Sequence, residues 1–446
     1  MPVNAANSNR PVSSHYRWVI CALLFWVTTA NYIDRSVFSN LAPTLEKEIG
    51  WTQDQYYNMA VAFTAAYAVS QMLAGRLMDV IGLRWGFALA CGFWGLAAMS
   101  HALASTVTGF FIVRVLLALG EGGNFPAAVK TTAEWFPKRE RALATGLFNS
   151  GSNVGGILVP FGLPYVVTLC ASFYVGGHAL GWRGAFLVTG LFDITWILAW
   201  LLIYKKPQEH PRVSPEELAF INSDPAEAAV KIPWRSLLPH RQAWALAGAR
   251  FMSDGFWWFY LFGTPYFFSD RFGFDLKARS GPVSVIYVLA SVGSIAGGWL
   301  SGYFMKLGWS INRARKITLF ICAACVLPVF FAAITQRAWL AVALIAVAAS
   351  AHQAWSANVY SLAGDMFPRR AVGSVTGLAG FAGSVGGLIL FSLIAHIRKL
   401  AEVSHDLGNY RLIFLAASLA YLTGAIIVQL LAPKLEPVDF EHETKA

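Results

Sequence analysis

The sequence predicts an all-α membrane protein with twelve transmembrane helices in two pseudo-symmetric halves of six helices each. Three observations support this: the composition is strongly apolar, the apolar residues form long windows, and a set of motifs recurs at a fixed distance. Of the 446 residues, 56% are hydrophobic and only 13% are charged, and the mean hydropathy is +0.52. Soluble domains carry about 25% charged residues, so lipid is the expected solvent.

The apolar windows are long enough to be membrane spans, which need about 20 predominantly apolar residues. Only helices and closed barrels satisfy the backbone inside lipid, and these windows are too long for barrel strands, so we predict helices. The predicted spans are 17–41, 55–78, 84–104, 107–130, 141–168, 184–204, 242–268, 281–306, 315–335, 338–362, 371–396 and 408–432.

The basic residues are unevenly divided between the two sets of loops. With twelve spans both termini lie on one side, and the loops of that side hold more than twice as many lysines and arginines as the others. This excess predicts that both termini are cytoplasmic. The net charge of +10 is therefore a topology signal and predicts no nucleic-acid partner. A proline-rich linker, 205–241, separates the predicted halves 1–204 and 242–446.

The two predicted halves are related in sequence. Glu134-Trp-Phe-Pro-Lys-Arg aligns with Asp365-Met-Phe-Pro-Arg-Arg at an offset of 231 residues. The same offset aligns Thr145-Gly-Leu with Thr376-Gly-Leu, and Val154-Gly-Gly with Val385-Gly-Gly. Several carriers are built from duplicated halves that hold their substrate near the membrane midplane. The repeat therefore favours a transporter.

A second motif, Gly75-Arg-Leu-Met-Asp79-Val-Ile-Gly82-Leu-Arg84, lies between spans two and three. An aspartate among arginines can form a charge cluster that latches neighbouring helices together. We therefore predict that Asp79 and Arg84 act in gating; the alternative is that the loop carries topology charge alone. The glycine and aspartate spacing resembles the loop signature of the major facilitator superfamily.

Ionisable residues within spans cost about 3 kcal/mol or more and are candidates for function. The clearest are Asp34 and Arg35 in span one, Arg114 and Glu121 in span four, and Asp254 in span seven, so the embedded charges are predicted to concentrate in the first half. Arg114 and Glu121 are seven residues apart and should face one cavity. Asp34 and Arg35 point about 100° apart, so one can bind ligand while the other pairs with a neighbouring helix. Structural ion pairs are the alternative.

Asp193 in span six and Asp254 suit a functional role and a structural ion pair about equally well. Pro126, just beyond Glu121, is predicted to kink span four.

Several segments resemble the anion:cation symporter family of the major facilitator superfamily, and bacterial hexuronate transporters in particular. The family motifs are Asn31-Tyr-Ile-Asp34-Arg35, Arg114…Gly120-Glu121…Pro126 and Glu134-Trp-Phe-Pro. The hexuronate likeness is carried by Ala66-Tyr67-Ala68, Phe148-Asn149-Ser150-Gly151-Ser152, Trp257-Trp258-Phe259-Tyr260-Leu261-Phe262 and Ala351-His352-Gln353-Ala354-Trp355-Ser356.

The resemblance implies the major facilitator fold and proton-coupled uptake of a hexuronate across a bacterial inner membrane. It implies a monomer in the lipid bilayer whose partners are a small organic anion and protons, with no enzyme activity, no cofactor and no metal. The arginine matching Arg35 or Arg114 would contact the anion, and the carboxylates matching Asp34 and Glu121 would handle protons. Tyr67 matches a substrate-site tyrosine.

Further substrate contacts are predicted from polar and aromatic side chains in the spans. Sugar hydroxyls are expected to bond Asn149, Ser152, His352, Gln353 and Asn358 as well as Tyr67. Trp257 and Trp355 would offer flat faces to the sugar ring, although such aromatics also pack between helices or face lipid.

Two departures from relatives affect the expected substrate. Ser152 stands where galactonate-type relatives have glutamine, which favours a hexuronate. Gly263-Thr-Pro-Tyr266 lacks the lysine that many hexuronate-type relatives have.

Five other functions are open or less favoured. An aldonate such as galactonate, or an aromatic acid, would suit the same charges. An exchanger of organic phosphate for phosphate is less favoured because Glu121 would repel a dianion. A membrane sensor or an integral enzyme is least favoured, because the spans contain no nucleophile–base set or metal-ligand cluster.

Overall fold

The computed structural model describes residues 15–175, 178–224, 232–274, 280–404 and 409–438, and these are almost entirely helical. The first part of the chain contains α1 Tyr16–Ile49, α2 Gln53–Ile81, α3 Leu83–Ser100, η1 His101–Leu103, α4 Val107–Glu121, α5 Asn124–Trp135, α6 Lys138–Cys170 and α7 Gly181–Ile203. The connection to the second part contains η2 Pro207–Glu209, α8 Pro215–Ile221 and η3 Trp234–Leu237.

The second part contains α9 Arg241–Trp258, the π-helical η4 Phe259–Gly263, α10 Thr264–Phe272, α11 Ser280–Lys306, α12 Ile311–Val326, η5 Leu327–Ala333, α13 Ala338–Met366, α14 Val372–Ser404 and α15 Asn409–Leu431. Among the described residues the only strands are β1 Tyr174–Val175 and β2 His178–Ala179, which pair antiparallel. The predicted all-α class is therefore confirmed, and every predicted span corresponds to one helical rod.

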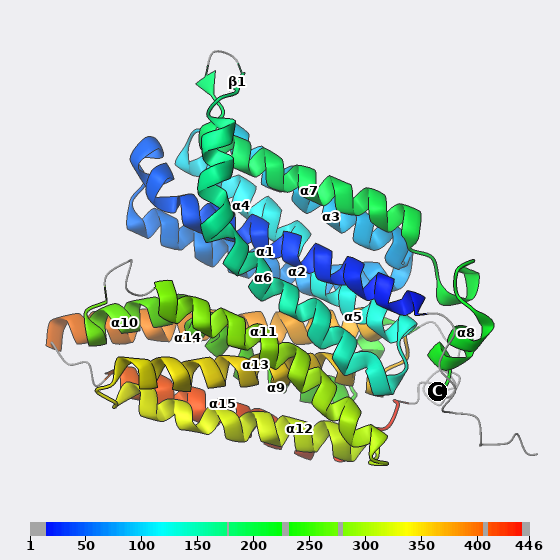
Figure 1. Ribbon diagram of the computed structural model, residues 1–446. Helices are drawn as coiled ribbons and strands as arrows, with labels where there is room; N and C mark the ends of the chain where they lie inside the picture. Colours follow the sequence, from blue (N-terminus) through cyan, green and yellow to red (C-terminus); the bar gives the residue numbers. More distant parts are fainter. Residues whose placement is uncertain (1–14, 176–177, 225–231, 275–279, 405–408, 439–446) are drawn as a thin grey trace, which may run out of the picture.

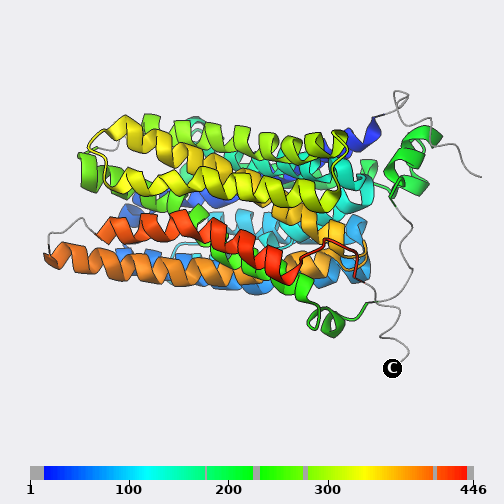
Figure 2. The ribbon, with the colours of Figure 1, turned by 90° about the horizontal axis from the view of Figure 1, so that it is seen from below.

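The helices run side by side in two groups, α1–α7 and α9–α15 (Figures 1 and 2). We call the end of the bundle that carries α8 the linker end and the end that carries β1 and β2 the hairpin end. The predicted linker 205–241 is partly helical, and its residues 225–231 lie outside the described residues. The division into two domains stays a prediction.

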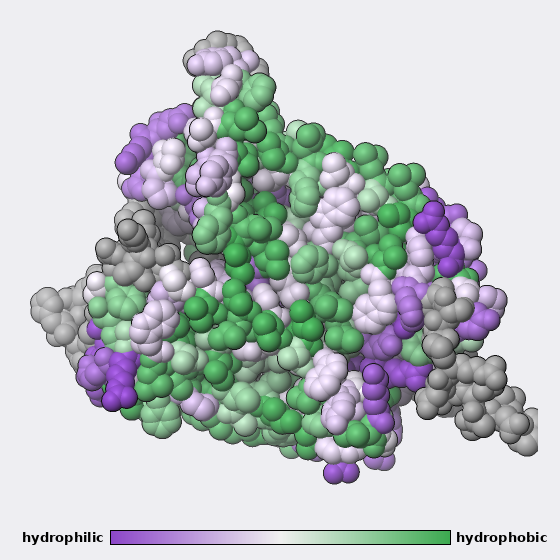
Figure 3. Space-filling model, viewed as in Figure 1, coloured by the Kyte–Doolittle hydropathy of each residue, from purple (hydrophilic) through white to green (hydrophobic). Residues whose placement is uncertain are grey.

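The surface of the bundle suits a lipid environment. Figure 3 shows apolar residues across the middle of the molecule and hydrophilic residues at its two ends. Large apolar side chains such as Leu96 and Leu202 are 65% and 81% exposed. Within the described ranges, nine helical segments are long and apolar enough to cross a membrane. The rods of α1, α2 and α9 fall outside that set, and α1 and α9 carry buried charges that prove central to the site.

Span four is broken where the sequence predicts a kink. α4 ends at Glu121 and α5 begins at Asn124, and Gly122 and Gly123 lie between them. Pro126 has no N–H to donate to the carbonyl of Gly122, and its ring would crowd that carbonyl. The regular helix is therefore interrupted one turn before the proline, at the place where the sequence predicts a kink.

The two groups of helices touch through α2 with α14 and through α6 with α11. Gly75 of α2 lies against the backbone of Gly373, and Gly298 of α11 lies against the carbonyl of Ala142. A Cβ atom at either glycine would overlap that backbone. Such close helix contact is typical of small residues in membrane proteins. These contacts lie toward the linker end, so the two groups are packed shut there.

The start of α1 is fixed to the linker. The carboxylate of Glu217 in α8 accepts hydrogen bonds from the backbone N–H groups of Tyr16 and Arg17, at 3.0 and 3.1 Å. The Arg17 guanidinium also pairs with Glu217 at 3.0 Å and with Glu140 of α6 at 2.9 Å. Glu217 thus satisfies N–H groups that an α-helix leaves free at its start.

Candidate functional site

A small cavity of about 40 Å³ lies between the two groups of helices. Its walls come from α1, α2, α5 and α6 on one side and from α9, α13 and α14 on the other. The lining residues are Tyr32, Tyr67, Gln71, Phe125, Asn149, Arg250, Asp254, Trp257, Trp258, His352, Gln353, Ser356, Tyr360 and Ser384. Aromatic walls with a few polar groups are typical of small-molecule sites, and this cavity must widen before it can admit a ligand the size of a sugar.

An arginine of the second group lies in this cavity. Arg250 of α9 is buried, its guanidinium pairs with the carboxylate of Asp254 one turn later, and it lies 4.2 Å from the ring centre of Tyr360. Arg250 and Asp254 thus add a charged pair from the second group to the embedded charges that are predicted in the first half. Arg250 lies inside the predicted span 242–268, and its spacing of four residues from Asp254 is a helical ion-pair signal that sequence reasoning missed.

A second pair of an arginine and a carboxylate, Arg35 and Glu121, lies behind the side chains that line the cavity. Arg35 of α1 donates from Nε and Nη2 to one carboxylate oxygen of Glu121, at 3.1 and 2.8 Å. Its guanidinium also lies 4.7 Å from the ring centre of Tyr67 and 5.5 Å from that of Trp258. Tyr67 and Trp258 both line the cavity, so the Arg35 guanidinium lies directly behind two of the lining rings.

Arg114 is placed differently from the prediction. It lies 4.4 and 4.2 Å from the ring centres of Phe38 and Phe63 and does not line the cavity. Its Nε and Nη1 have no hydrogen-bond partner among the described residues. Glu121 also lies outside the lining and reaches it only through Arg35. The shared face of Arg114 and Glu121 thus points into the first group of helices.

Polar lining residues connect the two groups of helices. Asn149 of α6 donates to the side-chain oxygen of Gln353 of α13 at 2.6 Å. Gln71 of α2 donates to Ser384 of α14 at 3.2 Å. A ligand that bonds these amides would compete with contacts between the halves, so its binding can be coupled to their movement.

One side of the cavity is a flat aromatic surface. The rings of Trp257 and His352 stack with centres 4.9 Å apart and planes 9° apart. Nδ1 of His352 bonds the hydroxyl of Tyr421 at 2.7 Å. This bond fixes the imidazole against the indole.

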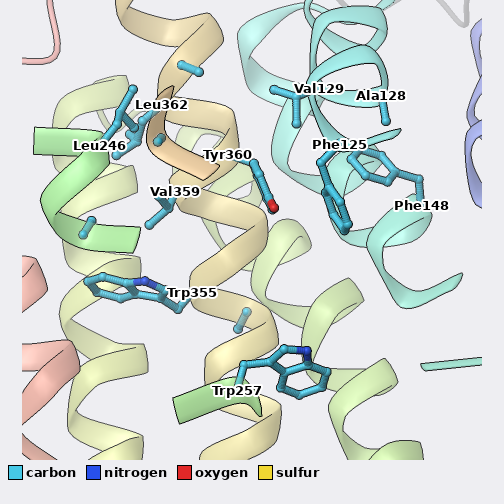
Figure 4. Close-up of a cluster of buried hydrophobic side chains, with 14 of the residues drawn as sticks. Phe125, Ala128, Val129, Phe148, Leu246, Trp257, Trp355, Val359, Tyr360 and Leu362 are labelled. Atoms are coloured by element: carbon cyan, nitrogen blue, oxygen red, sulfur yellow. The ribbon is translucent and has the colours of Figure 1, made fainter. Parts of the chain in front are cut away.

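Three further predicted contact residues, besides Arg35 and Arg114, do not line the cavity. Ser152 donates to the carbonyl of Asn149 in its own helix, and Asn358 donates to the carbonyls of Gly297 and Ala354. Trp355 is fully buried and packs edge-on against Tyr421. Figure 4 shows Tyr360 of α13 directed toward Phe125 while Trp355 leaves the helix on the other side. Asn358 and Trp355 thus connect α13 to α11 and α15, while the Ser152 hydroxyl is used within α6.

Known proteins with similar sequences are transporters. A family model described as Major Facilitator Superfamily matches residues 24–391. The chain belongs to the major facilitator superfamily. It is 29% identical over 434 residues to the hexuronate transporter of Escherichia coli strain K12, covering 96% of each chain. It is 32% identical over 311 residues to the galacturonate transporter of Dickeya chrysanthemi, covering 68% of this chain and 87% of the relative.

The fold comparison agrees. The proton:xylose symporter XylE matches with a TM-score of 0.72 at 13% identity, over 94% of this chain and 97% of that one. The family and the likeness to hexuronate transporters, both predicted from motifs, are confirmed. This member of the superfamily is thus a multi-pass membrane transporter of a small molecule.

The superfamily loop motif joins the two groups of helices at the linker end. One oxygen of Asp79 lies 2.6 Å from Nζ of Lys130. The carboxylate also accepts from the backbone N–H groups of Gly373 and Ser374, at 3.3 and 2.7 Å. These N–H groups open α14, where a helix attracts negative charge. Arg84 instead donates to the carbonyl of Leu201 and does not bond Asp79.

We expect an Asp79→Asn variant to open the linker end. The change removes the charge that pairs with buried Lys130 and with the start of α14, a loss of about 2 kcal/mol. The closed-to-open ratio should fall roughly 30-fold. Spin labels at Val80 and Leu307, which are 64% and 57% exposed, would report the separation across this end in a variant without the exposed Cys325.

The matched control for this experiment is Arg84→Gln. It removes a charge from the same loop but only one exposed bond to Leu201. We expect its distance distribution to match the wild type. Equal broadening in both variants would show that Asp79 contributes no specific closure.

Proposed function

We propose that this transporter is a proton-coupled symporter of a sugar-acid monoanion, a hexuronate. The observation that carries the proposal is the pairing of one arginine with one carboxylate on each side of the cavity: Arg35 with Glu121, and Arg250 with Asp254. The names of the hexuronate and galacturonate transporters above support the same substrate class.

In this charge arrangement a substrate carboxylate would replace Glu121 as the partner of Arg35. A substrate carboxylate can bond the Arg35 guanidinium through two parallel hydrogen bonds, as guanidinium and carboxylate are planar. Glu121 would then be a buried carboxylate that has lost its cation, which is costly. Taking up a proton removes that cost, so substrate and proton bind together.

The net charge of the buried site also disfavours binding of a dianion. With Glu121 and Asp254 both ionised, the two pairs around the cavity are neutral. One carboxylate and one proton keep the site neutral, while a phosphate dianion would leave a negative charge in a buried site. The neutral part of the cavity suits a hydroxylated ring, with Asn149 and Gln353 as hydrogen-bonding groups and Trp257 as a flat face.

The orientation follows from the basic residues. Lysines and arginines are in excess in the loops at the linker end, which we assign to the cytoplasm of a bacterial inner membrane together with both termini. Because the halves are packed shut at that end, the structure corresponds to a state closed toward the cytoplasm. We infer that the transport unit is one chain, since both groups of helices that line the cavity belong to one chain.

The proposal is tested with purified protein in proteoliposomes. Labelled D-galacturonate, D-glucuronate, D-galactonate and glucose 6-phosphate are offered with and without an inward proton gradient. We expect uphill uptake of a hexuronate only with the gradient. Phosphate exchange of glucose 6-phosphate without a gradient would overturn the proposal in favour of an exchanger, and uptake of galactonate alone would move it to aldonates.

A further inference from the structure

A second pair of buried acids lies away from the cavity, inside the first group of helices. Asp34 of α1 and Asp193 of α7 are 2% and 0% exposed. Their carboxyl groups lie within hydrogen-bonding reach of each other. Asp34 thus turns toward α7, while the next residue, Arg35, turns toward Glu121 and the cavity wall. The predicted separation of these two neighbours on the helix is confirmed.

The surroundings of the acid pair offer no counter-charge. The Thr189 hydroxyl lies beside Asp34, and the Trp94 indole and the Cys91 thiol lie beside Asp193. No described residue places a donor in good hydrogen-bond geometry on the four carboxylate oxygens. The other charged group that acts on both carboxyls is the carboxylate of Glu121 on α4, which is also negative.

Tight packing keeps the two carboxyl groups together. A Cβ atom on Gly95 of α3 would lie only 3.2 Å from a carboxylate oxygen of Asp193. The residue at position 95 therefore leaves just enough space for the acid. The Asp193 carboxyl group therefore cannot shift toward α3 without displacing that helix.

Two ionised carboxylates cannot share such a site, because like charges repel and burial penalises each of them. A proton between the two oxygens removes one charge and supplies the missing hydrogen bond. The proton then belongs to the pair rather than to either residue.

We propose that Asp34 and Asp193 form a second proton-binding site, in which Asp193 is the partner that lets Asp34 hold a shared proton. For its role in transport this inference rests on the proposed proton coupling; the shared proton itself does not. Loss of that proton places a further negative charge near Glu121 and favours protonation there. Proton binding at the two places is therefore linked through α1.

Infrared difference spectroscopy of the reconstituted protein tests the shared proton without any substrate. We expect the wild type to show a carbonyl band of a protonated carboxyl group that disappears when the pH is raised. Asp34→Asn and Asp193→Asn should each abolish this band, because the new amide donates the hydrogen bond that the shared proton supplied. The double variant should lose no more than either single variant, because one proton is shared.

Two matched comparisons make the outcome decisive. Asp254→Asn removes a carboxyl that pairs with Arg250 and should leave the band unchanged. If the two single variants each remove a separate part and the double variant removes the sum, the acids titrate independently and the proposal fails. Asparagine has the shape of aspartate, and elution of each variant as the wild-type species in size-exclusion chromatography confirms folding.

A transport measurement separates this proposal from the proposed function. With D-galacturonate as the probe, Asp193→Asn should lower gradient-driven accumulation toward the equilibrium ratio while it leaves counterflow exchange intact. Absence of gradient-driven uptake in the wild type would overturn the symport proposal but not the shared proton. Full accumulation by Asp193→Asn, together with an unchanged infrared band, would overturn the second site.

Discussion

A Glu121→Gln variant is expected to lose uphill uptake of the sugar acid while it keeps exchange of preloaded substrate. Glutamine has the shape of protonated glutamate but cannot release a proton, so substrate would move without one. A pH difference of one unit is worth about 1.36 kcal/mol and, at one proton per substrate, supports about tenfold accumulation. The variant should reach an internal-to-external ratio of about one under the same gradient.

Binding should survive in the same variant. Arg35 no longer pairs with a carboxylate, so a substrate carboxylate meets a guanidinium without a charged competitor. Counterflow at equal pH on both sides measures this directly. Glu134→Gln is the matched control, because Glu134 bonds the Tyr204 hydroxyl near the linker end and touches neither arginine of the site. Tenfold accumulation by Glu121→Gln would remove Glu121 from the proton pathway.

The sequence predicts the helices and the broken span four well because both depend on local chemistry. Span length is set by the thickness of lipid, and the break before Pro126 follows from a missing N–H group. The contact between Asp34 and Asp193 could not be predicted from local chemistry. They lie 159 positions apart in the chain, and only the packing of α1 against α7 brings their carboxyl groups together.

Helix geometry alone shows that some residues predicted to contact substrate cannot line the cavity together. Gln353 and Trp355 are two residues apart, which rotates them about 200° around the helix, so both cannot face one cavity. Gln353 lines the cavity and Trp355 packs on Tyr421, as this rotation requires. Ser152 is harder, because it follows Asn149 by three residues and shares its face. Only its bond to the Asn149 carbonyl shows that its hydroxyl is already used.

Arg250 places a charged group of the second half in the cavity. With the embedded charges in the first half, that half alone would bind anion and proton and the second would supply only neutral contacts. The Arg250–Asp254 pair gives the second half its own charged group in the cavity. A bound anion can then be held from both halves, and closure around it requires both to approach.

An Arg250→Gln variant is therefore expected to bind the sugar acid much more weakly. Loss of a buried charged hydrogen bond to the substrate costs about 3 kcal/mol, which is roughly 100-fold in Kd. Calorimetric titration of the detergent-purified protein with the sugar acid that the wild type transports would measure this directly. Arg183→Gln is the matched control, because Arg183 pairs with Glu48 in an exposed contact away from the cavity.

The single variant alone is ambiguous, since it leaves the Asp254 carboxylate in the bundle without its cation and can destabilise the fold. The double variant Arg250→Gln with Asp254→Asn removes both charges and should unfold at the wild-type temperature. If Arg250 binds substrate, the double variant remains about 100-fold weaker in affinity. If Arg250 only balances Asp254, the double variant regains wild-type binding, and the anion must be held by Arg35 and the first half alone.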